Sequence, residues 1–190
     1  DQTPDPEFFS EFPTASTMQE IGSPELLKDE PQYFTLSSGQ FEKNNADYIK
    51  VTMATSGMQQ ITKTGKTKGD VHETYVYFDI DFRWINDAGT PKTQNMFRTG
   101  FQGKVSGNYA HTFGFNIETF KNNGGMTDWS VKVTRVGGRI DTDDLEVTNA
   151  VFVNSIEVSI ADKLSYPYTA YVAGTIDAEQ FSGVPSRGYE

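Results

Sequence analysis

The amino-acid sequence predicts an all-β fold, an antiparallel β-sandwich with extended segments at its two ends. Apolar and polar residues alternate with a period of two in several stretches, which is the pattern of half-buried strands. The bulky residues also favour strands, since the 190 residues include 14 Phe, 9 Tyr and 2 Trp. Turn-forming residues separate these stretches, without the long amphipathic helices that a parallel α/β sheet would require.

The first segment, residues 1–32, is predicted to be an extended connector. Prolines recur there among acidic residues and a few aromatic ones. One short helix is expected inside it, with Ser23 as the N-cap, Pro24 as the first helical residue and Glu25 near the positive end of the helix dipole.

The clearest strand runs from Tyr75 to Trp84. Alternate residues give it an apolar face made of Val76, Phe78, Ile80, Phe82 and Trp84, and a second face made of Tyr75, Tyr77, Asp79, Asp81 and Arg83. The residues that follow, 86–89, tolerate positive φ and predict a turn into the next strand.

Similar alternation predicts further strands around residues 49–53, 113–117, 129–133 and 152–160. Breakers separate them at Ser56 and Gly57, and at residues 65–69, 122–125 and 137–138. The side chains expected inside the sandwich are Phe78, Ile80, Phe82, Trp84, Phe113, Phe115, Trp129, Val131, Val133, Ile156 and Val158.

Charge and composition exclude several classes of function. The formal net charge is −10 with a pI of about 4.6, so the molecule is expected to repel nucleic acid and anionic membrane surfaces. There is no Cys, hence no thiol nucleophile or thiolate metal site. No apolar run reaches the roughly 20 residues that a membrane span needs. Both ends look cut from something longer, so the chain is interpreted as a soluble fragment.

The residues that could carry catalysis or metal binding form no recognised pattern. His72 and His111 lack further ligands at metal-site spacing and are expected to be structural. Asp79 and Asp81 could serve glycoside hydrolysis or bind Ca²⁺. The preferred reading is a solvated strand face on which Arg83 offsets their charge.

Two further groups of residues are read in the same way. Asp141, Asp143 and Asp144 form a denser acidic run, but it lacks the Gly and Glu of an EF-hand and is expected to be a solvated loop. Ser56–Gly57, Gly65–Thr67 and Gly103–Ser106 hold only fragments of a phosphate-binding loop. The sequence therefore predicts no catalytic, cofactor-binding or metal-binding residue, no cofactor, and a protein that is not an enzyme.

Tyr75 and Tyr77 stand on the polar side of the clearest strand. They could form a platform on which a sugar stacks, or they could pack against another sheet or a neighbouring subunit. Packing is the preferred reading.

The last third of the sequence carries a series of short motifs. They are the strand Trp129 to Arg135, the strand Val151 to Ile160, and the segments Lys163 to Ala170, Ile176 to Phe181 and Val184 to Arg187. Their order resembles the host-specificity protein J family, the tail-tip attachment proteins of lambda-like siphophages. That family has W-x-(I/V)-x-V-x-R, then (K/R)-(L/F)-S-Y-P-x-T-A, (I/F)-D-A-E-Q-F and (V/I)-P-(S/T)-R. The resemblance covers residues 129–190 and, more loosely, Gly103–Ser106, while residues 1–100 match nothing.

The resemblance implies a virion protein that is synthesised in the bacterial cytoplasm. Family members look like homotrimeric hubs that close the tail tube, attach to the host and let DNA pass, in contact with other tail-tip proteins. Residues 33–163 are then an inserted accessory sandwich, 1–32 belong to the connector or the parent hub, and 164–190 return into the hub. The alternative function is a carbohydrate-binding sandwich that contacts a host receptor or glycan. A polysaccharide-degrading enzyme has least support.

The domain boundary is expected near Leu164. Asp162 and Lys163 form a polar break after the strand, and Pro167 cannot donate to a central ladder. Residues 166–190 are expected to lie peripherally or against residues 1–30, with the two ends together.

Overall fold

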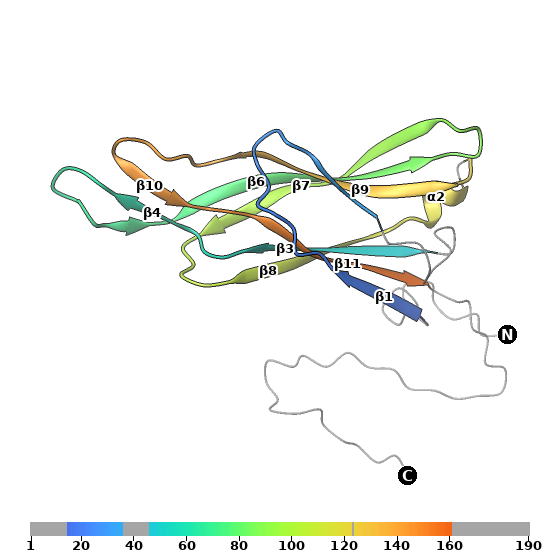
Figure 1. The fold of residues 1–190 in the computed structure, drawn as a ribbon, viewed down its shortest axis with the longest axis horizontal. Coiled ribbons are helices and arrows are strands. Elements are labelled where there is room, and N and C mark those ends of the chain that lie inside the picture. Colours follow the sequence, from blue (N-terminus) through green and yellow to red (C-terminus); the bar gives the residue numbers. More distant parts are fainter. Residues whose placement is uncertain (1–14, 36–45, 123, 161–190) are drawn as a thin grey trace, which may run out of the picture. The chain divides into compact units, whose positions relative to one another are not determined.

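The computed structural model describes residues 15–35, 46–122 and 124–160, and these form an all-β fold (Figure 1). The first sheet has the order β1 (Ala15–Glu20), β11 (Phe152–Ile160), β3 (Tyr48–Thr55) and β8 (Tyr109–Asn116). The second has the order β2 (Gln32–Phe34), β9 (Asp128–Gly138), β6 (Thr74–Ile85) and β7 (Pro91–Gly103). A third joins β10 (Leu145–Thr148), β4 (Gln59–Thr62) and β5 (Val71–His72), and a short helix, α2, covers Glu118–Asn122. The ladders within these sheets are antiparallel, which confirms the predicted fold class.

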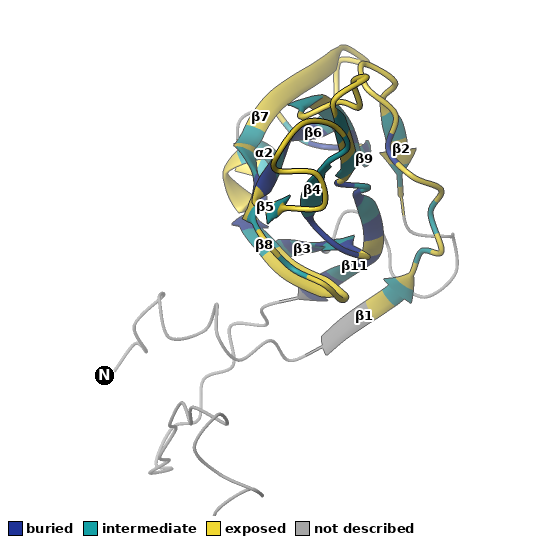
Figure 2. Cartoon of the chain, turned by 90° about the vertical axis from the view of Figure 1, so that its left-hand side faces the viewer, coloured by how far each residue is buried: buried dark blue, intermediate teal, exposed yellow. Residues whose placement is uncertain are grey.

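The hydrophobic core lies between the two four-stranded sheets, whose facing sides are the buried ones (Figure 2). Aromatic rings join the layers, since Phe78 and Phe82 of β6 lie 5.8 Å from Phe113 and Phe115 of β8, respectively, between ring centroids. The side chains expected inside are buried, except Trp84 and Phe113, which are partly buried against the core. The period-two reading is confirmed.

The turn after β6 forms as the sequence predicts. The backbone N–H of Thr90 donates to Asn86 Oδ1 at 2.7 Å, and Gly89 takes a positive φ of 74°. Asn and Gly suit this turn because the one bonds the backbone locally and the other tolerates left-handed φ. The chain can therefore reverse directly into β7.

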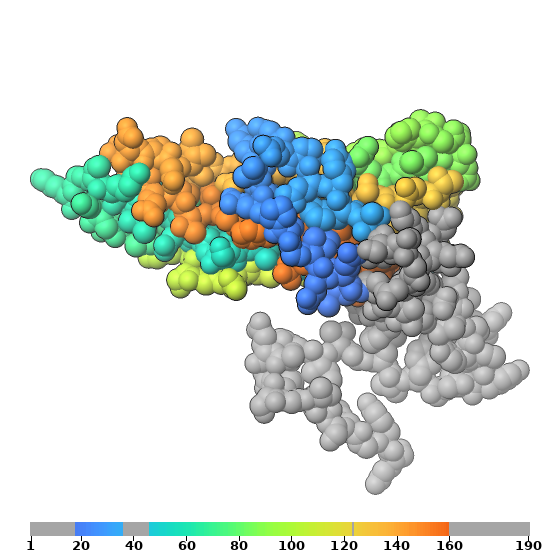
Figure 3. All heavy atoms as spheres, in the orientation of Figure 1, coloured from blue at the N-terminus to red at the C-terminus, as the bar shows by residue number. Residues whose placement is uncertain are grey.

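The predicted helix at Ser23 is wrong, and part of the expected connector is a strand. Residues 15–20 form β1, which pairs with β11. The Ser23 hydroxyl donates to the carbonyl of Val153 at 2.8 Å and accepts from its N–H at 2.9 Å, so it is not available to cap a helix. Residues 21–31 cross from the edge of the first sheet to that of the second (Figure 3), and Leu26 is fully buried on the way.

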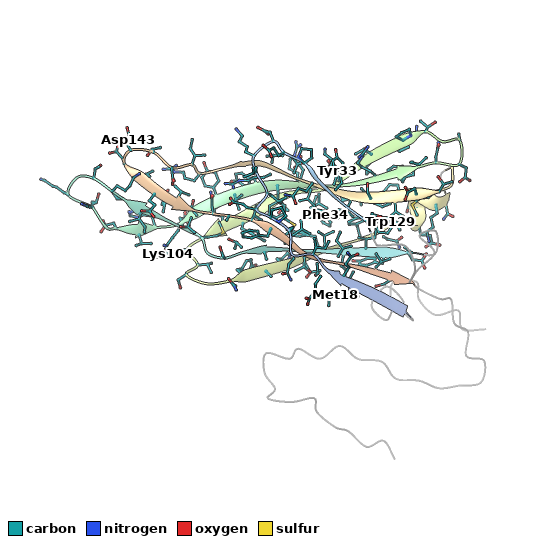
Figure 4. The ribbon with its side chains drawn as sticks, viewed as in Figure 1. Met18, Tyr33, Phe34, Lys104, Trp129 and Asp143 are labelled. Atoms are coloured by element: carbon teal, nitrogen blue, oxygen red, sulfur yellow. The ribbon has the colours of Figure 1, made fainter. Side chains whose placement is uncertain are left out.

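The third sheet lies at one end of the sandwich (Figure 1). The turn between β4 and β5 uses Gly65 and Gly69 at positive φ, as the predicted breaker requires. Lys104, near this end in Figure 4, donates to the carbonyl of Val71 at 3.1 Å. The loop with Asp143 lies at the same end (Figure 4).

The chain enters and leaves the described sandwich at neighbouring points. Ala15, the first residue of β1, is the register partner of Ile160, the last residue of β11. The expected boundary near Leu164 and the segment 164–190 lie outside the described residues. Within the described part, no helix is long and apolar enough to cross a bilayer.

Candidate functional surface

The solvent side of the second sheet, here called the outer face, carries both charged and aromatic side chains. Because β6 alternates and turns its even-numbered side chains to the core, its odd-numbered side chains form the middle of this face. Cross-strand neighbours come from β7 on one side and from β9 on the other. The outer face thus assembles residues that are far apart in the sequence.

Asp79 is not the solvated carboxylate that the sequence suggested. Only 7 % of the residue is exposed, and Arg98 of β7 binds its carboxylate through Nε at 3.0 Å and Nη2 at 2.7 Å. The hydrogen bond to Asp79, followed by the attraction between the two charges, raises the pKa of the Arg98 guanidinium above its ordinary value. This two-point contact fixes the orientation of the guanidinium plane.

Asp81 is likewise enclosed, with 8 % of the residue exposed. Lys132 Nζ of β9 donates to one of its oxygens at 3.0 Å, and Asn95 Nδ2 of β7 donates to the other at 2.8 Å. Arg83 does not offset either charge as expected, because its guanidinium lies 4.9 Å from the centroid of the Tyr33 ring. The expectation of a solvated face balanced by Arg83 is therefore wrong.

A polar network ties the segment after β1 to the second sheet. Arg135 of β9 donates to Glu25 Oε1 at 3.1 Å and to Asn149 Oδ1 at 2.8 Å. Asn149 is buried and donates in turn to the carbonyls of Tyr75 and Arg139. These bonds satisfy buried polar groups and hold the beginning of β6 in place.

Tyr77 is the most open aromatic residue of β6, with 44 % of it exposed. Its register partners are Gly100 on β7 and Gly137 on β9, so neither neighbouring strand places a side chain directly opposite it. The Tyr75 ring lies 5.3 Å away at 37° to it, between centroids and ring planes. An open hollow beside Tyr77 is lined by Arg98, Thr99, Gly100, Phe101, Gln102, Val136 and Gly137.

The other candidate residues are distributed over separate places. His72 ends β5 and is exposed, whereas the exposed His111 of β8 has its ring centroid 4.8 Å from that of Phe113. Asp141 accepts from the N–H of Val147 at 2.6 Å and Asp144 accepts from the Thr64 hydroxyl, so both carboxylates hold the exposed loop before β10.

The glycine-containing segments do not form a phosphate-binding loop. Gly57 lies in the turn between β3 and β4, Gly65 in the turn between β4 and β5, and Gly103 ends β7. Each is next to strands, whereas a phosphate-binding loop opens a helix. These segments therefore act as connections between strands.

The arrangement of side chains on the outer face suits ligand binding and not catalysis. Asp79 and Asp81 each form a salt bridge, with Arg98 and Lys132 respectively, so neither carboxylate is free to act as a nucleophile or general base. Among the described residues, no group of three or more His, Cys, Asp or Glu side chains could hold a metal ion. What the face offers is exposed aromatic surface beside polar groups held in fixed orientations.

A family comparison decides the class of the protein, because residues 34–162 match the family described as "Tip attachment protein J, FNIII-A domain". The chain belongs to this family. The resemblance to tail-tip attachment protein J is confirmed, and the chain is a structural component of a phage tail that serves attachment. It is thus a virion tail component that interacts with other tail proteins, and its family is a structural one.

The matched range extends the resemblance toward the beginning of the chain. It includes residues 34–100, for which the sequence motifs suggested no relative, and it ends before the motifs that begin at Lys163. No curated protein matches the chain. Among solved structures, the Tobacco streak virus coat protein dimer is 11 % identical, over 85 % of this chain and 96 % of that chain, with a TM-score of 0.25. That similarity is too low to support a shared fold.

The residues that sequence reasoning missed are the partners across strands: Arg98 and Asn95 on β7, Lys132 on β9, and the two glycines beside Tyr77. The sequence contained a signal for one of these residues, Gly100. A glycine within a strand often marks the close approach of another group, and Gly100 stands inside the run that forms β7. An added Cβ at Gly100 would clash first with the backbone carbonyl of Val76 and would also lie 2.7 Å from Tyr77 Cδ1.

Proposed function

We propose that this domain is an accessory module inserted into the central hub of the phage tail tip. In this proposal the hub is a homotrimer that attaches to the host and lets DNA pass, and the module stands on its outer surface. The protein is made in the host cytoplasm and joins the virion with other tail-tip proteins. It has no catalytic role.

The observation that carries the proposal, together with the family match, is the pairing of Ala15 with Ile160. Residues paired across antiparallel strands have Cα atoms about 4.5–5.5 Å apart. A domain whose entry and exit points are this close can be inserted into a parent domain without forcing apart the parent's own elements. The core between β6 and β8 is formed within residues 15–160, which supports a self-contained module.

The test is to replace residues 15–160 with Gly-Ser in the full-length tail protein of the phage. Two residues are sufficient, because the gap to be closed is a single strand spacing. The expected result is that tails assemble with normal length and a closed tip in electron micrographs, while adsorption to host cells falls. A matched control carries the same linker inserted between Asp87 and Ala88, in the exposed turn after β6, and should adsorb normally.

Loss of tail assembly in the replacement would contradict the accessory role, because the domain would then be part of the hub core. Unchanged adsorption would contradict a role in attachment. Because assembly and adsorption are measured separately, the two parts of the proposal are tested independently.

A further inference from the structure

Tyr77 lies in a gap of the outer face that the sequence keeps open. Outward positions of β7 on either side of Gly100 carry Arg98 and Gln102, two residues away in each direction. At about 3.3 Å per residue, these side chains start roughly 7 Å from Gly100 along the strand. Arg98 and Gln102 therefore lie on β7 on either side of the Tyr77 ring, and no β7 side chain lies directly opposite it.

The glycine on the other side keeps the gap open as well. An added Cβ at Gly137 would meet Tyr77 Cδ2 at 3.8 Å, an ordinary contact distance. Any larger side chain at this position would extend beside the ring and narrow the hollow. Val136, the neighbour in the hollow, is 36 % exposed and adds apolar surface at its rim.

The polar side chains differ in how firmly they are held. Two of the five N–H groups of Arg98 are used by Asp79, which leaves the guanidinium with donors for a second acceptor. Its plane is fixed by Asp79, yet 77 % of its side chain is exposed. Gln102 is also exposed and offers both a donor and an acceptor.

We propose that this hollow, made of Tyr77, Arg98, Gly100, Gln102 and Gly137, is a binding site for a saccharide unit of a neutral surface glycan. A sugar ring has an apolar C–H face and a rim of hydroxyl groups. The face stacks on Tyr77, and the rim receives hydrogen bonds from Arg98 and Gln102. Gly137 leaves the β9 side of the ring open to the sugar, whereas on the β7 side the Tyr77 ring itself lies against Gly100.

The charge of the site selects a neutral ligand. Asp79 neutralises Arg98, and the chain carries a formal net charge of −10, so no positive field attracts a phosphate or a nucleic acid. A stable protein partner needs about 800 Å² on each side, whereas the recess is centred on a single ring. With Asp79 held by Arg98, the site binds a glycan and does not cleave it.

The inference deepens the proposed attachment function, on which its biological setting depends. Binding itself is measured on the isolated 190-residue chain. Its failure would leave tail assembly and adsorption of the domain replacement unaffected, so the two failures are distinguishable.

The probe is an array of polysaccharides from bacterial surfaces, followed by titration of the best-bound glycan with ¹⁵N-labelled protein. The backbone amides of Gly100, Gln102 and Gly137 are expected to shift on binding. Tyr77→Ala should weaken binding at least about tenfold, given the usual contribution of an aromatic contact. Tyr33→Ala is the matched control, because Tyr33 lies on the same face and is 54 % exposed, but the Arg83 guanidinium stacks over its ring.

A second variant guards against a folding defect. Gln102→Ala removes an exposed side chain of β7 and should weaken binding several-fold through one lost hydrogen bond. Thermal melts of the variants should stay within a few degrees of the parent, since the changed side chains are exposed.

Several outcomes would overturn the proposal. They are the absence of binding to any glycan of the array, retention of full affinity by Tyr77→Ala, and an equal loss in Tyr33→Ala. If purified tail proteins bound the chain through Tyr77 while no glycan did, the hollow would be a protein interface and the proposal would be wrong.

Discussion

Replacing Lys132 with Met should destabilise the domain by leaving a nearly buried carboxylate without its cation. Lys132 Nζ lies 3.0 Å from Asp81 Oδ2, and the two side chains are 27 % and 12 % exposed. Met keeps most of the apolar stem of Lys but cannot donate a hydrogen bond. The substitution therefore removes the charge partner with little change in packing.

The size of the effect follows from what remains around Asp81. Removing one partner of a buried ion pair costs about 3–5 kcal/mol. Asp81 keeps the hydrogen bond from Asn95 at 2.8 Å and a small contact with solvent. We therefore expect a loss of about 2–3 kcal/mol, which lowers Tm by about 4–12 °C for a domain of this size.

The assay is urea unfolding followed by tryptophan fluorescence. Trp129 is buried and Trp84 is packed against the core, so both report on the sandwich. The control is Lys50→Met, because the Lys50–Glu157 pair joins β3 and β11 at 3.3 Å with side chains 35 % and 26 % exposed. A pair this exposed should contribute less than about 1 kcal/mol.

A second substitution tests the physical reason. Adding Asp81→Asn to Lys132→Met removes the unpaired charge and should recover part of the lost stability. If the double variant were no more stable than Lys132→Met, the loss would come from packing and the reasoning about a stranded carboxylate would be refuted. An equal loss in Lys50→Met would show that burial does not decide the strength of these pairs.

Three further predictions follow from the same structure. Thermal melts in excess chelator and in millimolar Ca²⁺ should nearly coincide, because Asp79 and Asp81 are neutralised by side chains; a chelator-induced fall of more than several degrees would contradict this. Sedimentation velocity at micromolar concentration should show a monomer, because the proposed trimer would be held together by the hub core, and a stable trimer of this chain would be incompatible with that proposal. Truncation after Lys163 should leave a cooperative melt within a few degrees of the full chain, since β11 completes its ladders with β1 and β3 by Ile160; unfolding of the truncated chain would place the boundary elsewhere.

The strands could be predicted because their signal is local. In β6 the alternation places Phe78, Ile80 and Phe82 on one face, and a face of that size has to be buried. The turn after β6 could also be predicted, since Asn86 and Gly89 stabilise it through a local hydrogen bond and a positive φ. The third sheet could not be predicted from the sequence, because its strands have only two to four residues and show little periodicity.

The wrong expectations share a cause, which is a contact distant in sequence. The helix expected at Ser23 depended on a hydroxyl that is bonded to Val153, 130 residues away. Within the expected connector, the partner of β1 is likewise distant, because β11 lies at the other end of the domain. The capping signal around Ser23 does not produce a helix, because the backbone of β11 satisfies the same hydroxyl and Leu26 nearby is buried in the core.

The charges of the outer face show why same-strand neighbours are poor guides in a sheet. Arg83 follows Asp81 by two residues on one face, which separates their Cα atoms by about 7 Å along the strand. Cross-strand partners have Cβ atoms about 4.5–5.5 Å apart. Asp79 is opposite Arg98 and Asp81 is opposite Lys132, so these cations reach the carboxylates first. Arg83 is left to stack on Tyr33, and the pairing of Asp79 with Arg98 and of Asp81 with Lys132 follows from strand register, which no single strand encodes.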